Sequence, residues 1–214
     1  MKKLVILLEP DKNHWEHIYR TKGPADLSWT QAQPSTSLDF IHSFNLPHTA
    51  RIIDIGGGDS HLVDCLLDNG YTNLTVLDIS GSALRKAQQR LGARAHLVQW
   101  VEQDITQFNP TTSYDLWHDR ATFHFLTTET QIAAYLTIAR LSVTANRYTL
   151  IGTFSDQGPE KCSGLPIRQY SPDSLVRQLE GFEKIKCITE DHITPFDTRQ
   201  NFTFCSFKRR PDAV

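Results

Sequence analysis

Residues able to hold a ligand are concentrated where an apolar run gives way to a helical pattern, in Arg51-Ile-Ile-Asp-Ile-Gly-Gly-Gly-Asp-Ser-His-Leu62. Gly56 and Gly58 lack a Cβ atom, so the chain can turn sharply there and a ligand can approach the backbone. The helix that follows offers free N–H groups and a partial positive charge. Asp54 ends the strand, a costly place for a carboxylate unless it binds something. The stretch therefore predicts a ligand-binding loop, with a plain strand-to-helix turn as the alternative.

Two further acids follow the next two apolar runs. Asp78 ends the run in Leu74-Thr-Val-Leu-Asp-Ile79, and a carboxylate at the tip of a second strand can accept hydrogen bonds from both hydroxyls of a ribose. Asp104, in Val101-Glu-Gln-Asp-Ile105, is placed to accept from an adenine amino group while Ile105 packs on the ring. The alternatives are a helix cap for Asp78 and a turn for Asp104.

With these three acids in this order, the chain resembles the class I S-adenosylmethionine-dependent methyltransferases, of the small single-domain bacterial type, over nearly its whole length. In that family the glycine loop cradles the methionine part of S-adenosylmethionine, the acid after strand two holds the ribose, and the acid after strand three meets adenine. The resemblance therefore implies S-adenosylmethionine as the cofactor. The cofactor site that it implies comprises the acids, the glycines and their apolar neighbours: Asp54, Gly56, Gly58, Asp78, Ile79, Asp104 and Ile105. Ser60 departs from the pattern, because a third glycine is common there.

A nicotinamide or flavin enzyme is the competing interpretation of the glycine loop. Its fingerprint is Gly-x-Gly-x-x-Gly, with a pyrophosphate over the helix N-terminus. Here His61 occupies the position of the third glycine, and Asp54 would place a negative charge beside a pyrophosphate. Both features disfavour an NAD-dependent oxidoreductase.

The fourth strand leads into Tyr114-Asp-Leu-Trp-His-Asp-Arg-Ala-Thr-Phe-His-Phe-Leu126, which we expect to face the transferred methyl group. The stretch resembles Asp-Lys-Gly-Thr-Phe of a branch of protein-lysine methyltransferases and, more closely, Trp-His-Asp-Arg-Ala-x-Phe-His-Phe-Leu of small bacterial methyltransferases. Asp119 is predicted to hold a substrate amine or the cofactor's ammonium group, and His118 or His124 to accept a proton. Arg120 is a candidate substrate contact. Satisfied, partly buried histidines are the alternative for His118 and His124.

Aromatic residues near the N-terminus are predicted to close over the site. Trp15, Tyr19 and Ser28-Trp-Thr-Gln31 are similar to a segment that folds over the cofactor in related enzymes. A sulfonium cation gains cation–π attraction from ring faces, and a closed lid excludes water. Trp29 is therefore a candidate cofactor contact and Tyr19 a candidate substrate contact, with ordinary packing onto the sheet as the alternative.

The loop after the fifth strand, residues 155–170, is predicted to cover the substrate pocket. Loops at the carboxyl ends of strands are where such sheets bind their ligands. Cys162, Arg168 and Tyr170 are therefore candidate substrate contacts, and the alternative is a structural loop with a surface thiol.

Strands and helices alternate in a way that predicts an α/β fold with a Rossmann-like, seven-stranded, mostly parallel sheet, helices on both faces and a C-terminal antiparallel hairpin. The predicted strands are Ala50–Ile55, Leu74–Leu77, His96–Val101, Tyr114–His118, Tyr148–Phe154, Glu183–Glu190 and Asn201–Phe207. The predicted helices are Asn13–Tyr19, Ser35–Phe44, Ser60–Asn69, Gly81–Leu91, Thr128–Leu141 and Pro172–Leu179. The last two strands are too close for a parallel crossover, which predicts the hairpin. We expect one domain, with residues 1–48 as a helical cap and 49–214 as the core.

Composition narrows the possible partners. The 214 residues carry a formal charge of −2, which disfavours nucleic acid. The apolar run Leu4–Leu8 is too short for a membrane span or a signal peptide, so we expect a cytoplasmic protein without a membrane partner. Cysteines at 65, 162, 187 and 205 form no CxxC pair, which favours reduced thiols over disulfides and predicts no metal site.

The function predicted from these features is transfer of the methyl group of S-adenosylmethionine to an N, O or S atom of an acceptor. The chain lacks added basic or repeat modules for grasping a macromolecule, which favours a small-molecule acceptor. A protein N-methyltransferase of the lysine type is the main alternative. A non-catalytic cofactor-binding protein and an NAD-dependent oxidoreductase are the others, and the sequence leaves the oligomeric state open.

Overall fold

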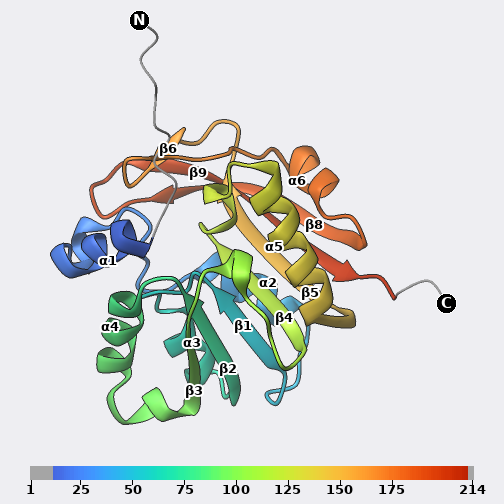
Figure 1. Cartoon of the computed structure of the whole chain (residues 1–214), viewed down its shortest axis with the longest axis horizontal. Coiled ribbons are helices and arrows are strands. Elements are labelled where there is room, and N and C mark those ends of the chain that lie inside the picture. Colours follow the sequence, from blue (N-terminus) through green and yellow to red (C-terminus); the bar gives the residue numbers. More distant parts are fainter. Residues whose placement is uncertain (1–11, 212–214) are drawn as a thin grey trace, which may run out of the picture.

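One seven-stranded sheet organises the protein (Figure 1). The computed structural model describes residues 12–211, so the apolar run Leu4–Leu8 lies outside the described residues. The strands are β1 (Arg51–Ile55), β2 (Asn73–Asp78), β3 (Val98–Glu102), β4 (Tyr114–Arg120), β5 (Val143–Phe154), β8 (Phe182–Ile193) and β9 (Arg199–Arg209). Their order is β3-β2-β1-β4-β5-β9-β8. Strands β1 to β5 pair in parallel, whereas β9 runs antiparallel to β5 and β8. The predicted fold class is confirmed.

The strand order reverses between β1 and β4, because β2 and β3 lie on one side of β1 while β4 and β5 lie on the other. In sheets of this kind a crevice opens at such a point, beyond the carboxyl ends of the strands. The topology therefore directs the search for a site to the ends of β1, β2 and β4.

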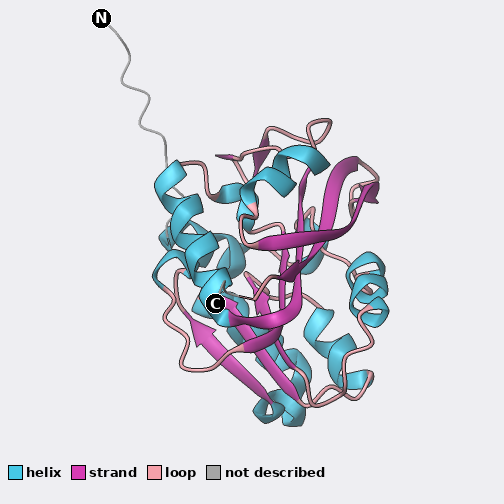
Figure 2. Ribbon diagram, turned by 90° about the vertical axis from the view of Figure 1, so that its right-hand side faces the viewer, coloured by secondary structure: helices cyan, strands magenta, loops and turns pink. Residues whose placement is uncertain are grey.

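Helices cover both faces of the sheet (Figure 2). They are α1 (Lys12–Thr21), α2 (Ser35–Ser43), α3 (Leu62–Asp68), α4 (Gly81–Leu91), α5 (Glu129–Ser142) and α6 (Pro172–Gln178), with 3₁₀ turns at Pro24–Asp26, Gly92–Leu97, Ile105–Gln107 and Phe123–Phe125. Successive strand residues point to opposite faces. Accordingly, Ile52 packs with the buried side chains of α2, α3 and α4, and Ile53 with those of α5 and α6.

Several segments differ in detail from the predicted elements, and the longest extension is in β5, which begins at Val143 rather than Tyr148. The third strand begins at Val98 rather than His96, because the preceding residues form the 3₁₀ turn Gly92–Leu97, where the His96 Nδ1 lies 2.6 Å from the Ala93 carbonyl oxygen. The loop at 155–170 contains two short strands, β6 (Lys161–Cys162) and β7 (Leu165–Pro166), which pair with each other.

Helix α1 is fastened to the start of α4 by a buried acid, Glu16. Its carboxylate accepts hydrogen bonds from the Ser82 backbone N–H (2.9 Å) and the Ser80 hydroxyl (3.1 Å), and pairs with Arg20 (3.0 Å). Burial would raise the pKa of Glu16, but these hydrogen bonds and the Arg20 charge lower it to about 2. The carboxylate is therefore ionised, and it holds α1 at the end of β2.

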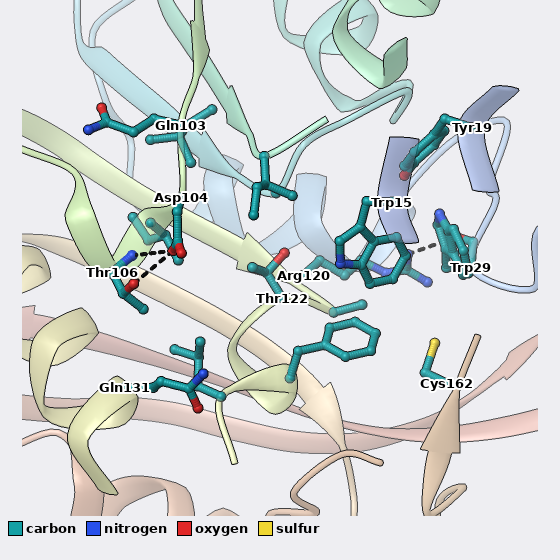
Figure 3. A pocket seen from close by; sticks show the side chains of 17 residues that line it. Trp15, Tyr19, Trp29, Gln103, Asp104, Thr106, Arg120, Thr122, Gln131 and Cys162 are labelled. Carbon is teal, nitrogen blue, oxygen red and sulfur yellow. Dashed lines mark hydrogen bonds between the residues drawn. The ribbon is translucent and has the colours of Figure 1, made fainter. Parts of the chain in front are cut away.

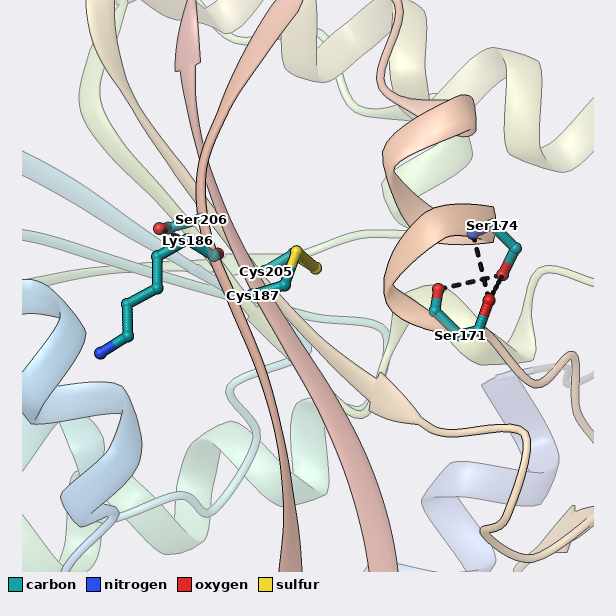
Figure 4. The surroundings of a disulfide bond; sticks show 6 residues. All are labelled: Ser171, Ser174, Lys186, Cys187, Cys205 and Ser206. Carbon is teal, nitrogen blue, oxygen red and sulfur yellow. Dashed lines mark hydrogen bonds between the residues drawn. A yellow bond between two sulfur atoms is a disulfide. The ribbon is translucent and has the colours of Figure 1, made fainter.

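A disulfide joins Cys187 of β8 to Cys205 of β9, so the prediction of four reduced thiols is wrong (Figure 4). The two residues are direct partners in the antiparallel pair, with Cα atoms 4.2 Å apart. Their separation of 18 positions conceals this proximity in the sequence. Cys65 and Cys162 are free thiols. The cysteines therefore do not support the expectation that the protein resides in a reducing compartment.

Candidate functional site

The backbone of the glycine loop after β1 lies unusually close to side chains of neighbouring elements. Gly56 and Gly58 have φ angles of +61° and +47°, which L side chains rarely adopt. A Cβ at Gly56 would collide with the Thr122 hydroxyl. A Cβ at Gly58 would lie 2.8 Å from the Tyr19 hydroxyl oxygen and 3.0 Å from Oδ2 of Asp78. The missing side chains thus bring the loop, α1 and the end of β2 into one compact wall.

Asp78 ends β2 as a buried carboxylate beside this loop. Its Oδ1 accepts a hydrogen bond from the Ser80 backbone N–H at 2.7 Å. Burial raises the pKa of Asp78 to about 7, and the charges of Asp54 and Glu16 act in the same direction. Such a carboxylate gains from hydroxyl donors that stabilise its ionised form. This fits the predicted contact with a ribose.

Asp54 is paired within the protein. Its Oδ1 lies 2.7 Å from Nδ1 of His118, and Nε2 of His118 lies 2.9 Å from the Ser37 hydroxyl oxygen. A carboxylate only accepts hydrogen bonds, so Nδ1 of His118 donates to Asp54, and Nε2 of His118 shares a hydrogen bond with the Ser37 hydroxyl. All three side chains are buried. This chain of hydrogen bonds fixes the Asp54 carboxylate, and both Asp54 and His118 line a small cavity beside the glycine loop.

A larger cavity lies at the carboxyl ends of β1, β2, β3 and β4 (Figure 3). At one end Asp104 accepts hydrogen bonds at 2.8 Å from both the backbone N–H and the hydroxyl of Thr106, and Ile79 and Ile105 line the wall nearby. The predicted adenine contacts and the predicted apolar neighbours therefore come together in one cavity.

Aromatic rings close the other end of this cavity (Figure 3). Trp15 lies edge-on to Phe125 with ring centroids 4.9 Å apart, and edge-on to Trp29 at 6.1 Å. Tyr19 packs against Trp29 at 6.4 Å, and burial raises the pKa of the Tyr19 hydroxyl. The predicted aromatic lid thus lines the cavity, and the ring faces are available to a cation.

Arg120 and Cys162 also line the larger cavity, and Arg120 lines the smaller one as well. Burial lowers the pKa of Arg120 to about 10 and raises the pKa of the Cys162 thiol to about 12. At neutral pH the first is therefore a cation and the second a neutral thiol.

Asp119 does not reach either of these cavities, which corrects the prediction that it holds an amine. Its Oδ1 accepts from the backbone N–H groups of Thr122 and Phe123, each at 3.1 Å, and its Oδ2 accepts from the Tyr135 hydroxyl at 2.8 Å. Burial raises the pKa of Asp119 to about 6. The carboxylate is a structural partner of the turn after β4 and of α5.

His124, Arg168 and Tyr170 also lie outside both cavities. His124 is fully buried, its Nδ1 accepts from the Phe154 backbone N–H at 3.2 Å, and burial lowers its pKa to about 3. Arg168 pairs with Glu129 at 2.6 Å. Tyr170 is buried against Phe123. The two cavities therefore give no support to their predicted roles in proton transfer and substrate binding.

Several lining residues were missed by the sequence analysis. Phe125, Leu126, Gln103, Thr106, Thr122 and Gln131 all line the larger cavity. Most follow directly after β3 or β4, so proximity to a strand end was the available signal. Gln131 lies on α5, and only the packing of that helix on the sheet brings it to the cavity.

Residues 12–211 contain neither a metal-binding cluster nor a membrane-spanning helix. No cluster of three or more His, Cys, Asp or Glu side chains in that range is arranged to hold a metal ion. None of the helices in the same range is long and apolar enough to cross a bilayer.

A family model described as a methyltransferase domain matches residues 52–143. The chain is 22% identical over 141 residues to the eEF1A lysine and N-terminal methyltransferase of Mus musculus, covering 65% of this chain and 20% of that protein. It is 36% identical over 110 residues to a malonyl-[acyl-carrier protein] O-methyltransferase of Anoxybacillus flavithermus, covering 50% of this chain and 39% of that protein. The chain thus spans about a fifth of the length of the mouse relative.

Solved structures share the fold at low sequence identity. A SAM-dependent methyltransferase from Anabaena variabilis superposes with a TM-score of 0.72 at 13% identity, and the superposition covers 98% of this chain and 100% of that chain. The glycopeptide N-methyltransferase MtfA, complexed with S-adenosylmethionine, superposes with a TM-score of 0.62 at 16% identity, covering 82% and 87%.

Proposed function

The chain contains a methyltransferase domain and has the fold of the class I S-adenosylmethionine-dependent methyltransferases, and on this premise we propose that it methylates a small molecule at an N, O or S atom. S-adenosylmethionine is the cofactor of these enzymes. The observation that carries the proposal is the convergence of Asp78, Asp104 and the glycine loop on one end of the sheet, where Asp104 and Gly56 line a cavity with an aromatic wall and Asp78 lies buried beside Gly58.

The residues that line the cavity, together with Asp78 and Gly58 beside it, fit the cofactor. The space that a Cβ would fill at Gly58 lies beside the Asp78 carboxylate, whose burial favours a partner that donates hydroxyl groups. Asp104 and Ile105 offer an acceptor and an apolar surface for adenine, and Trp15 and Trp29 offer ring faces for a sulfonium. When bound, S-adenosylmethionine supplies an electrophilic methyl group. The protein's contribution is then to align the acceptor with that group and to exclude water.

The predicted general bases are poorly placed to deprotonate an acceptor. His118 is engaged with Asp54 and Ser37, and neither His124 nor Asp119 lines the larger cavity. Cys162 and Tyr19 do line it, but burial raises both pKa values, so both are protonated at neutral pH and cannot take up a proton. This favours an acceptor that needs no base, such as an amine or thiol that arrives deprotonated.

A protein acceptor is the second candidate, and its support is the relationship to a lysine and N-terminal methyltransferase. The enclosing aromatic wall of Trp15, Tyr19 and Trp29 supports the small molecule. Both candidates use the same cofactor site.

The test is methyl transfer from radiolabelled S-adenosylmethionine to a panel of small amines, thiols and hydroxyl compounds, with a lysine-containing peptide in parallel. Asp78→Ala is the inactive reference, and Asp173→Ala, an exposed acid on α6, is the matched control. We expect label in a small amine or thiol with wild type and Asp173→Ala, and none with Asp78→Ala. Label in the peptide alone would favour the protein acceptor. Cofactor binding without transfer across the panel would favour a non-catalytic binding protein.

A further inference from the structure

Arg120 is a partly buried cation that the protein leaves incompletely paired. It is the last residue of β4, and its guanidinium carbon lies 5.0 Å from the centre of the Phe202 ring on β9. Its Nη1 donates a hydrogen bond to the Trp29 carbonyl oxygen at 2.9 Å. A guanidinium has five N–H donors, so this bond uses only one of them.

The remaining donors have no acceptor within the described chain. The Nε–H group of Arg120 is buried without a hydrogen-bond partner, and no carboxylate of residues 12–211 lies within 4.0 Å of the guanidinium. Burial lowers its pKa, and the charges of Glu190 and Asp54 offset this only from a distance. Burying a charge without a partner is costly. A guanidinium that lines a cavity with unpaired N–H donors can bind an anionic ligand from outside the protein.

The position of the guanidinium indicates which ligand supplies that anion. In the sheet, β5 and β9 lie on the side of β4 opposite to β1 and the glycine loop. Arg120 lines the smaller cavity beside the glycine loop as well as the larger one, but its guanidinium carbon lies over the Phe202 ring of β9, on the far side of β4. The resemblance to the class I methyltransferases assigns the cofactor's amino-acid part to the glycine loop. The anion at Arg120 therefore belongs to the other occupant of the cavity, the acceptor.

The number of charges indicates the kind of anion. Arg120 is the only Lys or Arg among the residues that line either cavity. One guanidinium matches the single charge and planar shape of a carboxylate, which it can hold with two parallel hydrogen bonds. Around it, Trp15, Trp29 and Phe125 provide an apolar and aromatic wall.

We propose that Arg120 binds a carboxylate of the methyl acceptor, so that the enzyme selects small apolar or aromatic carboxylic acids. This inference rests on the proposed function and adds the acceptor's class to it. Arg120 is then a specificity-determining residue, and the apolar wall receives the body of the acceptor.

The test compares carboxylic acids with their uncharged amides on protein saturated with S-adenosylhomocysteine. The probe pairs are anthranilate with anthranilamide, benzoate with benzamide, and phenylacetate with phenylacetamide, titrated by calorimetry. We expect wild type to bind at least one acid tenfold or more tightly than its amide, because a charge-assisted pair of hydrogen bonds is lost in the amide. Arg120→Gln should bind both members of that pair equally. Arg147→Gln, which removes a partly exposed arginine paired with Asp115, should keep the preference.

Arg120 also holds the Trp29 carbonyl, so a second variant separates binding from folding. Arg120→Lys retains the charge but loses the planar fork, and its preference for the acid should fall between those of wild type and Arg120→Gln. No preference for any acid in wild type, or a preference that survives in Arg120→Gln, would overturn the proposal.

The cofactor's own carboxylate is the other source from which the anion could come. Methylthioadenosine lacks the cofactor's amino-acid part, so comparing its binding with that of S-adenosylhomocysteine tests this alternative. If Arg120→Gln weakened the binding of S-adenosylhomocysteine but not of methylthioadenosine, Arg120 would hold the cofactor and the proposal would be wrong. We expect both ligands to bind the variant within about twofold of wild type. Failure of S-adenosylhomocysteine to bind wild type would instead refute the proposed function.

Discussion

Asp78→Asn is expected to stabilise the ligand-free protein above pH 7 while weakening its cofactor binding. The pKa of Asp78 is raised from 3.8 to about 7, chiefly by burial. Between these two values the folded protein keeps a proton that the unfolded chain has released. The stability of wild type therefore falls as the pH rises from about 4 to about 7, and the full penalty is present above pH 7.

The magnitude follows from the shift. The rise in the pKa of Asp78 from 3.8 to about 7 corresponds to a penalty of about 4 kcal/mol in the free energy of unfolding, at 1.36 kcal/mol per pH unit. Asparagine removes this penalty, but it also loses the charge-assisted hydrogen bond from the Gly58 backbone, which costs about 1–2 kcal/mol. The net gain in the free energy of unfolding should be about 2–3 kcal/mol at pH 8, decreasing by about 1.4 kcal/mol per pH unit below 7.

The assay is urea unfolding of wild type, Asp78→Asn and the exposed control Asp173→Asn at each pH from 4 to 8, without ligand. The difference between Asp78→Asn and wild type should grow from pH 4 to 7 and then remain constant. The free energy of unfolding of Asp173→Asn should change with pH as that of wild type does. A difference that does not vary with pH over this range would show that Asp78 is not a strained buried acid, and the reasoning from burial would fail.

The remaining predictions concern the cofactor, the loop and the hairpin. Because ribose hydroxyls donate to the ionised form of Asp78, the affinity of wild type for S-adenosylhomocysteine should be constant above pH 7 and fall by up to about tenfold per unit below it, as measured by calorimetry. Gly58→Ala should lose at least about tenfold in this affinity, because its Cβ would lie 2.8 Å from the Tyr19 hydroxyl, whereas Gly164→Ala, also at positive φ but in open space, should bind as wild type does. Reduction of the Cys187–Cys205 disulfide, which closes a loop of 18 residues, should lower the free energy of unfolding by about 3 kcal/mol in urea titrations with and without dithiothreitol. A smaller change in Cys65→Ser under the same reductant would show that the reagent acts elsewhere.

The fold and the cofactor site were accessible from the sequence because each depends on local patterns. Buried parallel strands appear as apolar runs, and an acid at the end of such a run must lie at the carboxyl edge of the sheet. Asp78 and Asp104 were assigned in this way, and the structure brings both to that edge. The hairpin followed from a connection too short for a crossover.

The incorrect predictions concern residues whose contacts depend on the direction of a side chain or on the register of two paired strands. In His118-Asp119-Arg120 successive side chains point to opposite faces, so His118 and Arg120 face the cavities while Asp119 faces Tyr135 of α5. The pairing of Cys187 with Cys205 depends on the register of β8 and β9, which the sequence does not specify. The sequence analysis assigns no role to Glu16, and only the docking of α1 on α4 reveals it as a buried anchor.

Calorimetric titration with S-adenosylhomocysteine, in parallel with NAD, tests the central claim most directly. Wild type should bind S-adenosylhomocysteine with micromolar affinity, Asp78→Ala should lose that binding, and NAD should bind neither protein. Absence of S-adenosylhomocysteine binding to wild type, or tighter binding of NAD, would contradict the assignment of this cavity as the cofactor site of a methyltransferase.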